Sequence, residues 1–299
     1  MKISVIIPAL NEEATVAKVV KDFRRNKKVS EVIVYDGNSS DKTRELARKA
    51  GAKVYVQDGK GKGLAIREIF ERIDTDIYVL VDGDDTYPAE RLDDLLKPVL
   101  EKMADMVVGT RINKMSEKGS LTRLHRFGNR TISKTIGFCF GNKLNDVLSG
   151  YRVINRKLAK NIALTSSGFE IETELTIKSL IGNYMLKEMP IKYRKRRGES
   201  KSKLSSFGDG YLIFYTIFSM FKDYRPLLFF SILSMVFGLM GIFWGYIVLD
   251  EWFRTGLITK IPTAILSALF IFLSVQFFTI GIILDAINKG YRRVKNIFS

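Results

Sequence analysis

The chain has 299 residues and a formal net charge of +16, because 48 Lys and Arg residues outnumber 32 Asp and Glu residues. This length suits one domain of about 200 residues with an appendage. The charge favours nucleic acid, an anionic membrane surface or phosphorylated ligands. Nucleic acid is not expected, since the sequence has neither a zinc-finger spacing nor an RNA-binding aromatic signature. With one cysteine, Cys139, and one histidine, His125, a disulfide is excluded, and Ser-His-Asp chemistry or a multi-histidine metal site is not expected.

The amino terminus, MKISVIIPALNEE, does not predict a signal peptide. Its apolar run is too short, and acidic residues follow where a cleavage site would need small ones. We therefore expect the N-terminal region to stay in the cytoplasm.

Residues 1–110 alternate short strand-like runs with amphipathic helical patterns. The strand-like runs are 3–8, 31–36, 52–57, 76–82 and 105–109, and the helical patterns lie at about 12–26, 41–50, 62–73 and 89–102. Near-continuous apolar strands separated by such helices predict an α/β fold, with a Rossmann-like parallel sheet covered on both faces. Ligands of these sheets bind beyond the carboxyl ends of the strands. The polar residues at those ends are Asn11, Asp36, Asp58 and Asp82.

Residues 111–206 are less regular. We expect a basic amphipathic stretch at 120–136, a helix at 168–182 and a strand at 184–193. The densest basic cluster, KYRKRRGESKSK at 192–203, contains seven Lys or Arg residues and one Glu. It lies shortly before two apolar segments, which favours an anionic membrane surface or a phosphate as its partner.

The carboxyl-terminal third predicts membrane attachment. Residues 207–226 read as an aromatic amphipathic helix in the membrane interface. The segments at about 227–249 and 263–287 are each long enough to span the hydrocarbon core. Both flanks of this pair are basic, so we expect both termini and the catalytic domain in the cytoplasm and the hairpin tip outside. The alternative, two buried helices of a soluble core, stays open.

The stretch IYVLVDGDDTYP, at 77–88, places three carboxylates directly after a buried strand. Asp82 and Asp84 have the alternate spacing that can present oxygens toward one point, as hard cations such as Mg²⁺ require. Asp85 is expected to serve the turn before Pro88. The alternative for the whole group is a solvated structural turn.

Two further stretches follow strand ends. Asp36 opens YDGNSSDKT and suits recognition of base or ribose N–H and O–H groups, although Asp41 in the same stretch also reads as a helix cap. The glycine-rich, basic DGKGKG at 58–63 precedes a helix and is a plausible cradle for phosphates. It is neither a Walker A loop nor a dinucleotide-binding fingerprint.

The order of these motifs resembles a known family. VIIPALNEE, VIVYDGNSSDKT, GKGLAIR, VDGDDTYP, VVGTR, DVLSGYR and YRKRRGESK occur as in family-2 glycosyltransferases of the GT-A fold. The resemblance is strongest to the polyprenyl-phosphate group, the dolichyl-phosphate mannose and glucose synthases, and GKGLAIR looks more like the glucose branch. It covers about residues 1–206. We therefore expect a GT-A domain at 1–206, an interfacial helix at 207–226 and a membrane hairpin with a basic tail at 227–299.

The resemblance also implies roles for individual residues. The nucleotide-sugar donor would be bound by Pro8, Asn11, Glu13, Asp36, Lys62, Arg67, Asp82 and Arg111. A divalent cation, Mg²⁺ or Mn²⁺, would be held by Asp82 and Asp84. The acceptor phosphate would be bound by Arg126, Arg196, Ser200 and Lys201. The residues implied as catalytic are Asp84, Arg126, Asp146 and Arg152. Thr86 departs from the pattern, because some relatives carry Gln there as a further metal ligand.

The reaction implied is transfer of one sugar from a nucleotide-diphosphate donor to dolichyl or polyprenyl phosphate, with inversion. UDP-glucose or UDP-N-acetylglucosamine is favoured over GDP-mannose. The sequence lacks the Q-x-x-R-W motif of processive synthases, which argues against polymerisation. Two alternatives stay open: transfer to a hydroxyl of another membrane lipid, with Asp146 as base, and a non-catalytic nucleotide-sugar-binding module. Whether the chain forms a homo-oligomer is also open.

Overall fold

The computed structural model describes residues 1–112, 116, 123–196 and 208–297. The chain divides into two compact units, Met1–Ile217 and Phe218–Ser299. The division falls inside α8 (Gly208–Tyr224).

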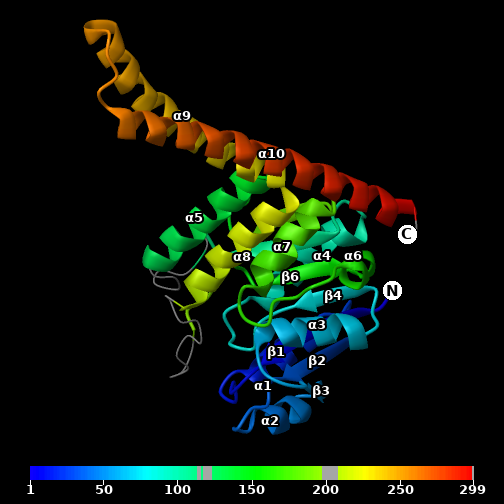
Figure 1. Cartoon of the computed structure of the whole chain (residues 1–299). Coiled ribbons are helices and arrows are strands. Elements are labelled where there is room, and N and C mark those ends of the chain that lie inside the picture. The colour runs from blue at the N-terminus through cyan, green and yellow to red at the C-terminus, as the bar shows by residue number, and fades with distance from the viewer. Residues whose placement is uncertain (113–115, 117–122, 197–207, 298–299) are drawn as a thin grey trace. The chain divides into compact units, whose positions relative to one another are not determined.

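The first unit is built on a seven-stranded sheet in the order β3-β2-β1-β4-β6-β5-β7 (Figure 1). Its strands are β1 (Ile3–Ala9), β2 (Glu31–Asp36), β3 (Lys53–Val56), β4 (Ile77–Leu80), β5 (Met106–Thr110), β6 (Arg152–Asn155) and β7 (Leu186–Pro190). The pairs β1–β2, β1–β4, β2–β3 and β5–β7 are parallel. β6 runs antiparallel to both β4 and β5, between which it lies.

This topology confirms the predicted α/β fold and the five strands expected in residues 1–110. The five strands of residues 1–110 run in the same direction, as expected, and β6, from the less regular region that follows, inserts antiparallel between β4 and β5. Four residues, RVIN, form β6, and so short a run carries no distinct periodicity. The predicted strand at 184–193 is confirmed as β7.

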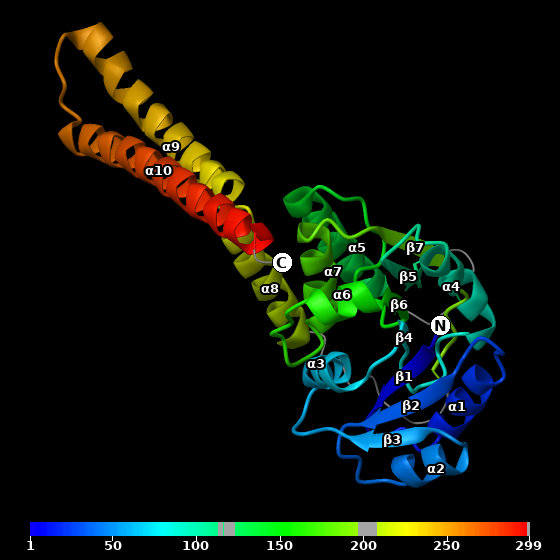
Figure 2. The ribbon, with the colours of Figure 1, turned by 90° about the vertical axis from the view of Figure 1, so that its right-hand side faces the viewer.

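Helices cover both faces of the sheet, as expected. One face carries α1 (Val16–Arg24), α2 (Thr43–Lys49) and α4 (Leu92–Leu100), which follows the 3₁₀ turn η1 (Ala89–Arg91). The other face carries α3 (Lys62–Arg72), α6 (Arg156–Asn161) and α7 (Ile171–Ile181). Figure 2 shows the two groups on opposite sides of the strands. The remaining helix of this region, α5 (Arg123–Phe140), matches the basic amphipathic stretch.

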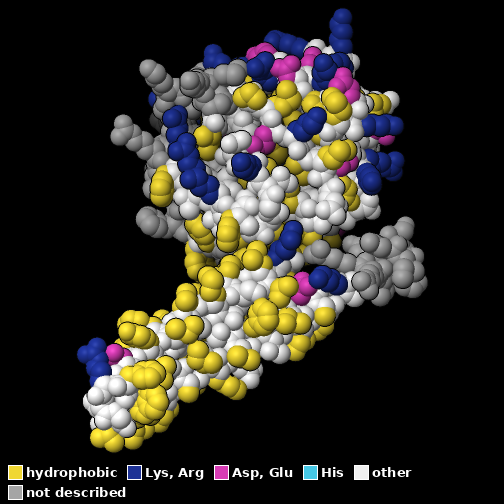
Figure 3. Space-filling view, turned by 90° about the horizontal axis from the view of Figure 1, so that it is seen from above, with side chains coloured by type: hydrophobic (Ala, Val, Ile, Leu, Met, Phe, Trp, Pro, Cys, Tyr) yellow, Lys and Arg dark blue, Asp and Glu magenta, His cyan; other side chains and the backbone are white. Residues whose placement is uncertain are grey.

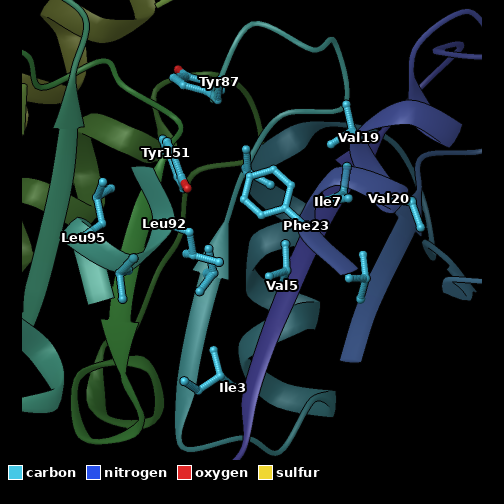
Figure 4. Close-up of a cluster of buried hydrophobic side chains, with 14 of the residues drawn as sticks. Ile3, Val5, Ile7, Val19, Val20, Phe23, Tyr87, Leu92, Leu95 and Tyr151 are labelled. Carbon is cyan, nitrogen blue, oxygen red and sulfur yellow. The ribbon is translucent and has the colours of Figure 1, made fainter. Parts of the chain in front are cut away.

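The alternation of side chains along β1 explains the two-sided core. Val5 and Ile7 pack with α1, as Figure 4 shows, whereas Ile6 packs with α3 on the other face. All three side chains are fully buried. Burying one such side chain stabilises the folded state by about 1.5–3 kcal/mol. Because both faces of β1 are packed in this way, the strand and its carboxyl end are held in place.

The second unit contains α9 (Pro226–Thr255) and α10 (Ile261–Ile297). Each includes a window of mean hydropathy 2.2 that is long enough to cross a membrane. Only 11% and 6% of these windows is buried, and Figure 3 shows apolar side chains along the exposed face of the hairpin. The predicted apolar pair is therefore confirmed as two candidate spans.

The two spans pack through small residues. A Cβ atom on Gly241 would lie 2.7 Å from Ile271, and one on Gly245 would lie 2.8 Å from the Ser267 hydroxyl. The Ser267 hydroxyl donates to the carbonyl of Gly241 at 2.8 Å, and that of Ser274 donates to the carbonyl of Ser234 at 2.8 Å. Close packing of small residues with hydroxyl hydrogen bonds is typical of helix pairs in membranes.

Candidate active site

The candidate site lies where the parallel strands end. β1 and β2 are in register up to Ala9 and Asp36, and β4 continues into Asp82 at the same edge. Because β6 is antiparallel, its first residue, Arg152, pairs with Leu80 and brings the preceding loop to this edge too. The fold therefore gathers polar residues that are far apart in the sequence.

Asp82 is held by a buried lysine. The Lys62 ammonium lies 2.6 Å from Oδ1 of Asp82 and 2.6 Å from Oε1 of Glu172. Burial alone would lower the pKa of Lys62, but the negative charges of Asp82 and Glu172 outweigh it and raise the pKa above its usual range. A small pocket is lined by these three side chains together with Pro8, Gly150 and Arg152.

Asp84 is more deeply buried than Asp82. Its Oδ1 accepts hydrogen bonds from the Thr86 hydroxyl at 2.6 Å and the Thr86 backbone N–H at 3.2 Å. Its Oδ2 lies 3.0 Å from the Arg196 guanidinium, which also contacts Glu12 at 3.2 Å. Burial and the nearby charge of Asp82 raise the pKa of Asp84. Thr86, at the position that departs from the family pattern, therefore orients Asp84.

Asp85 belongs to a different arrangement. It has a positive φ of 57° and pairs with Lys18 at 2.6 Å and with Arg194 at 3.3 Å. Asp85 therefore has different ion-pair partners from Asp82 and Asp84, in agreement with its expected role in the turn.

The chemistry of Asp82 and Asp84 fits a divalent cation. The described residues contain no cluster of three or more His, Cys, Asp or Glu side chains suited to a metal. Two carboxylates are nevertheless enough for Mg²⁺ or Mn²⁺ when diphosphate oxygens and water complete the coordination. The residues present thus fit a cation shared with a substrate.

Asp36 is buried, and one of its two carboxylate oxygens has no hydrogen-bond partner among the described residues. Its side chain is fully buried, and Oδ2 accepts from the Ser39 N–H at 3.0 Å and lies 3.5 Å from Arg44. Its Oδ1 has no hydrogen-bond partner among the described residues. A buried oxygen without a partner costs about 1–3 kcal/mol, so Asp36 Oδ1 is available to accept a hydrogen bond from a bound group.

Two other residues that were predicted to bind the nucleotide sugar make hydrogen bonds between loops. Asn11 Oδ1 accepts from the Ser40 N–H at 2.9 Å, and Glu13 Oε2 accepts from the Lys42 N–H at 3.0 Å. These bonds join the segment after β1 to the segment after β2. Arg67 is half-buried on α3.

The glycines of DGKGKG permit a close approach. Gly61 has a φ of +113°, and a Cβ on it would lie 2.3 Å from the carbonyl oxygen of Ser167. A Cβ on Gly63 would lie 2.4 Å from the carbonyl oxygen of Ser166. The segment is thereby fixed against residues 166–167, and this places Lys62 at the start of α3.

Arg111 and Asp146 form a buried pair at the end of β5. Arg111 donates from Nε and Nη2 to the two carboxylate oxygens at 3.0 and 2.8 Å. Asn129 on α5 donates to Asp146 at 2.6 Å. Burial would raise the pKa of Asp146, but these contacts, with Arg111 foremost, lower it.

Arg152 is buried and forms hydrogen bonds to neighbouring segments of the chain. Its guanidinium is 1% exposed and donates to the carbonyls of Val147, Ser149 and Glu172 and to the Thr176 hydroxyl. Burial lowers its pKa to about 10. Its bonds connect the loop before β6 to α7, the helix that carries Glu172.

Some residues are separate from this cluster or were missed. Arg126 is exposed on α5, and Ser200 and Lys201 lie outside the described residues. For the acids of GFEIETE, Glu170, Glu172 and Glu174, the sequence leaves open an active-site role and a helix-start role, and the structure brings Glu172 to Lys62. Glu12 and Asn129 carry no signal in the sequence, since their roles depend on partners distant along the chain.

Comparisons with known proteins agree with this geometry. The model of the family described as glycosyl transferase family 2 matches residues 4–163. The Haloferax volcanii glycosyltransferase AglJ is 35% identical over 97% of this chain and 95% of its own length. A dolichyl-phosphate hexose transferase of the same organism is 35% identical over 70% of this chain and 89% of its own. The solved structure of Mycobacterium tuberculosis glucosyl-3-phosphoglycerate synthase with Mn²⁺, UDP and its product has a TM-score of 0.62 at 24% identity, covering 73% of this chain and 79% of that one.

Proposed function

The chain belongs to glycosyl transferase family 2, and we propose that it transfers one sugar from a nucleoside-diphosphate donor to dolichyl or another polyprenyl phosphate. The observation that carries the proposal is the meeting of Asp82 and Asp84 with Lys62 and Arg196 at the ends of the strands. Two carboxylates and two cations at one edge suit a metal-bound diphosphate and a second anionic substrate.

The acceptor is inferred to be a phosphate rather than a hydroxyl. A phosphomonoester has a second pKa of about 6 and is mostly ionised at neutral pH, so it attacks without a general base. A hydroxyl acceptor would need a base, for which Asp146 is the candidate. Asp146 is buried and bonded to Arg111 and Asn129, which supports the phosphate. The similarity to a dolichyl-phosphate hexose transferase also supports a phosphate acceptor.

The donor site is inferred to surround Asp36 and Asp82. Asp36 Oδ1 would accept a hydrogen bond from the base or ribose. We favour UDP-glucose or UDP-N-acetylglucosamine, in part because the structure of the glucosyl-3-phosphoglycerate synthase, which has a similar fold, contains UDP and Mn²⁺. A divalent cation on Asp82 and Asp84 would neutralise charge that develops on the leaving nucleoside diphosphate.

The chain's own residues would supply orientation and electrostatics. Lys62, which is held by Glu172 at 2.6 Å, would direct its ammonium at the diphosphate. Arg196, held by Glu12 and Asp84, would hold the acceptor phosphate against a diphosphate of like charge. Attack by that phosphate on the anomeric carbon breaks the bond to the diphosphate in one displacement and inverts the configuration.

The membrane spans fit a lipid acceptor. We propose that α9 and α10 anchor the enzyme, that residues 207–226 lie in the interface and that the GT-A domain, residues 1–206, is cytoplasmic. The exposed aromatic residues Tyr211, Phe214 and Tyr215 of α8 support an interfacial position. The product would be a lipid-linked sugar for glycosylation reactions.

A competition assay tests this proposal. Purified full-length protein receives Mg²⁺ or Mn²⁺ and UDP-glucose, UDP-N-acetylglucosamine or GDP-mannose in separate reactions, each with polyprenyl phosphate and diacylglycerol together. We expect a glycosylated polyprenyl phosphate and unchanged diacylglycerol. Transfer to diacylglycerol alone would establish the hydroxyl alternative, and donor binding without transfer would favour a non-catalytic module.

A further inference from the structure

We propose that Asp146 is a positioning residue that fixes Arg111 as a binding group for a substrate phosphate, and that it is not a general base. The inference rests on the proposed function, because it assumes substrates that carry phosphate. It gives Arg111 and Asp146 a role in substrate binding. It also leaves transfer to a lipid hydroxyl without its candidate general base.

The carboxylate of Asp146 has no capacity left for a proton from substrate. Oδ2 accepts from the Arg111 backbone N–H at 2.7 Å and from Nε at 3.0 Å. Oδ1 accepts from Arg111 Nη2 at 2.8 Å and from Asn129 Nδ2 at 2.6 Å. A carboxylate offers about four acceptor positions, and these four bonds use them. Asp146 is 1% exposed, so its carboxylate is shielded from solvent, whereas a general base must come within hydrogen-bond distance of the proton that it removes.

The same bonds leave one side of Arg111 available. Asp146 occupies the Nε and Nη2 edge of the guanidinium, while Nη1 has no hydrogen bond to a side chain among the described residues and the arginine side chain remains 14% exposed. The Tyr193 ring lies 5.6 Å from the guanidinium carbon. A guanidinium fixed along one edge and against an aromatic ring presents its remaining N–H groups without further loss of rotamer freedom.

A second layer holds Asp146 itself. Glu188 on β7 accepts from the backbone N–H groups of Asn145 and Asp146 at 2.9 and 3.0 Å. β7 pairs with β5, whose last residue, Thr110, precedes Arg111. The strand that presents Arg111 and the strand that anchors Asp146 are therefore neighbours, and the pair is built into the sheet.

Contacts connect this pair to Asp82, one of the two proposed metal ligands. The Tyr193 ring is 5.2 Å from the ring of Tyr87, whose hydroxyl accepts from the Gly150 N–H at 2.9 Å. Gly150 is so close to Asp82 that a Cβ would lie 2.7 Å from its Oδ2. Arg111 thus belongs to the same site as Asp82, and its ligand is a phosphate oxygen of the acceptor or of the donor.

The pKa of Asp146 agrees with this geometry. Burial would raise it, yet Arg111 and Asn129 bring it below its ordinary value. A weaker base than a free aspartate is suited to holding a cation and is poorly suited to removing a proton.

A double-mutant cycle tests the proposal in the full-length protein. Asp146→Asn, Arg111→Lys and the double variant are compared for kcat and for the KM of each substrate. We expect each single change to lower kcat/KM about 10–100-fold, the range for one charged contact. The double variant should match Arg111→Lys within about threefold, because Asp146 acts through Arg111. A rise in KM for polyprenyl phosphate would assign the acceptor phosphate, and a rise for the nucleotide sugar would assign the donor.

Opposite results overturn the proposal. If the two losses multiply, or if Asp146→Asn removes the acidic limb of the pH profile of kcat/KM, Asp146 acts on substrate as a base.

Arg111→Ala with added guanidinium provides a measurement that does not depend on folding of the Asp146 variant. Recovery of activity is expected, and absence of recovery counts against a phosphate-binding Arg111. Glu31→Gln, which removes a charge at the opposite end of β2, is the control for unchanged kinetics. If the wild-type protein transfers no sugar to polyprenyl phosphate, the proposed function fails instead.

Discussion

Lys62 donates to Glu172 on α7 and to Asp82 after β4, with its nitrogen 2.6 Å from each carboxylate. The lysine begins α3, so this relationship joins two helices on one face of the sheet to a strand end. Because Glu172 is 5% exposed and has Lys62 as its ion-pair partner, it fixes where the ammonium lies.

We predict that Glu172→Gln lowers kcat/KM for the nucleotide sugar by about 10–100-fold, since a charged hydrogen bond contributes about 1.5–3 kcal/mol. Steady-state kinetics of the full-length protein check this. Glu174→Gln is the matched control on the same helix, because Glu174 binds Thr165, Ser166 and Lys178 instead. The control should lose thermal stability and keep its kinetics. Equal kinetic losses in both variants would mean that α7 has only a structural role.

Asp36→Asn tests the unpartnered oxygen of Asp36. We predict a rise of about 10–100-fold in the KM for the donor, because the charged acceptor is lost, and little change in the KM for the lipid. Asp58→Asn is the control, since Asp58 also follows a strand but is 75% exposed and pairs with Arg72. An unchanged donor KM in Asp36→Asn would remove Asp36 from the donor site.

The sequence predicts the strands of residues 1–110 well because apolar runs are local, and it places Asp82 and Asp84 close to the end of one of them for the same reason. Apolar runs mark β1, β2 and β4, and Asp82 lies two residues after the end of β4. β6 has no such run, and its antiparallel insertion depends on contacts with β4 and β5. The partners of the site residues were beyond prediction for the same reason. Glu172 reaches Lys62, and Asn129 reaches Asp146, only after α7 and α5 are packed.

Glu31 should make stability depend on pH. Burial would raise its pKa, but hydrogen bonds from Lys2, Lys53 and Ser4 lower it from 4.5 to about 2. A pKa that is lowered on folding stabilises the protein above the unfolded value, and this contribution is lost as the pH falls through the folded value. Glu31→Gln should thus lower the melting temperature by about 2–6 °C at pH 7.

The difference between wild type and Glu31→Gln should shrink between pH 4.5 and pH 2. Thermal unfolding of the full-length protein, followed by circular dichroism, measures it. A difference that stays constant over this interval would show that Glu31 contributes through packing and not through its charge.

The membrane orientation is tested with single cysteines. Cys139 is the only cysteine and is buried, so Cys139→Ser provides the background. Leu257 lies between α9 and α10 and is 65% exposed. Because the tail after α10 is basic, Leu257→Cys should react with an impermeant maleimide in intact cells, and Ser299→Cys should react only after permeabilisation. The reverse pattern would contradict a cytoplasmic catalytic domain.

The central claim is transfer of a sugar to a lipid phosphate with help from Asp82 and Asp84. Mass analysis of the lipid formed by wild type and Asp84→Asn, with and without a metal chelator, tests it most directly. We predict that wild type with metal yields polyprenyl phosphate carrying one hexose or N-acetylhexosamine with its phosphate retained. Chelation or Asp84→Asn should abolish this product while the protein stays folded. The same product from Asp84→Asn at the wild-type rate, or no sugar on polyprenyl phosphate with any donor, would contradict the account.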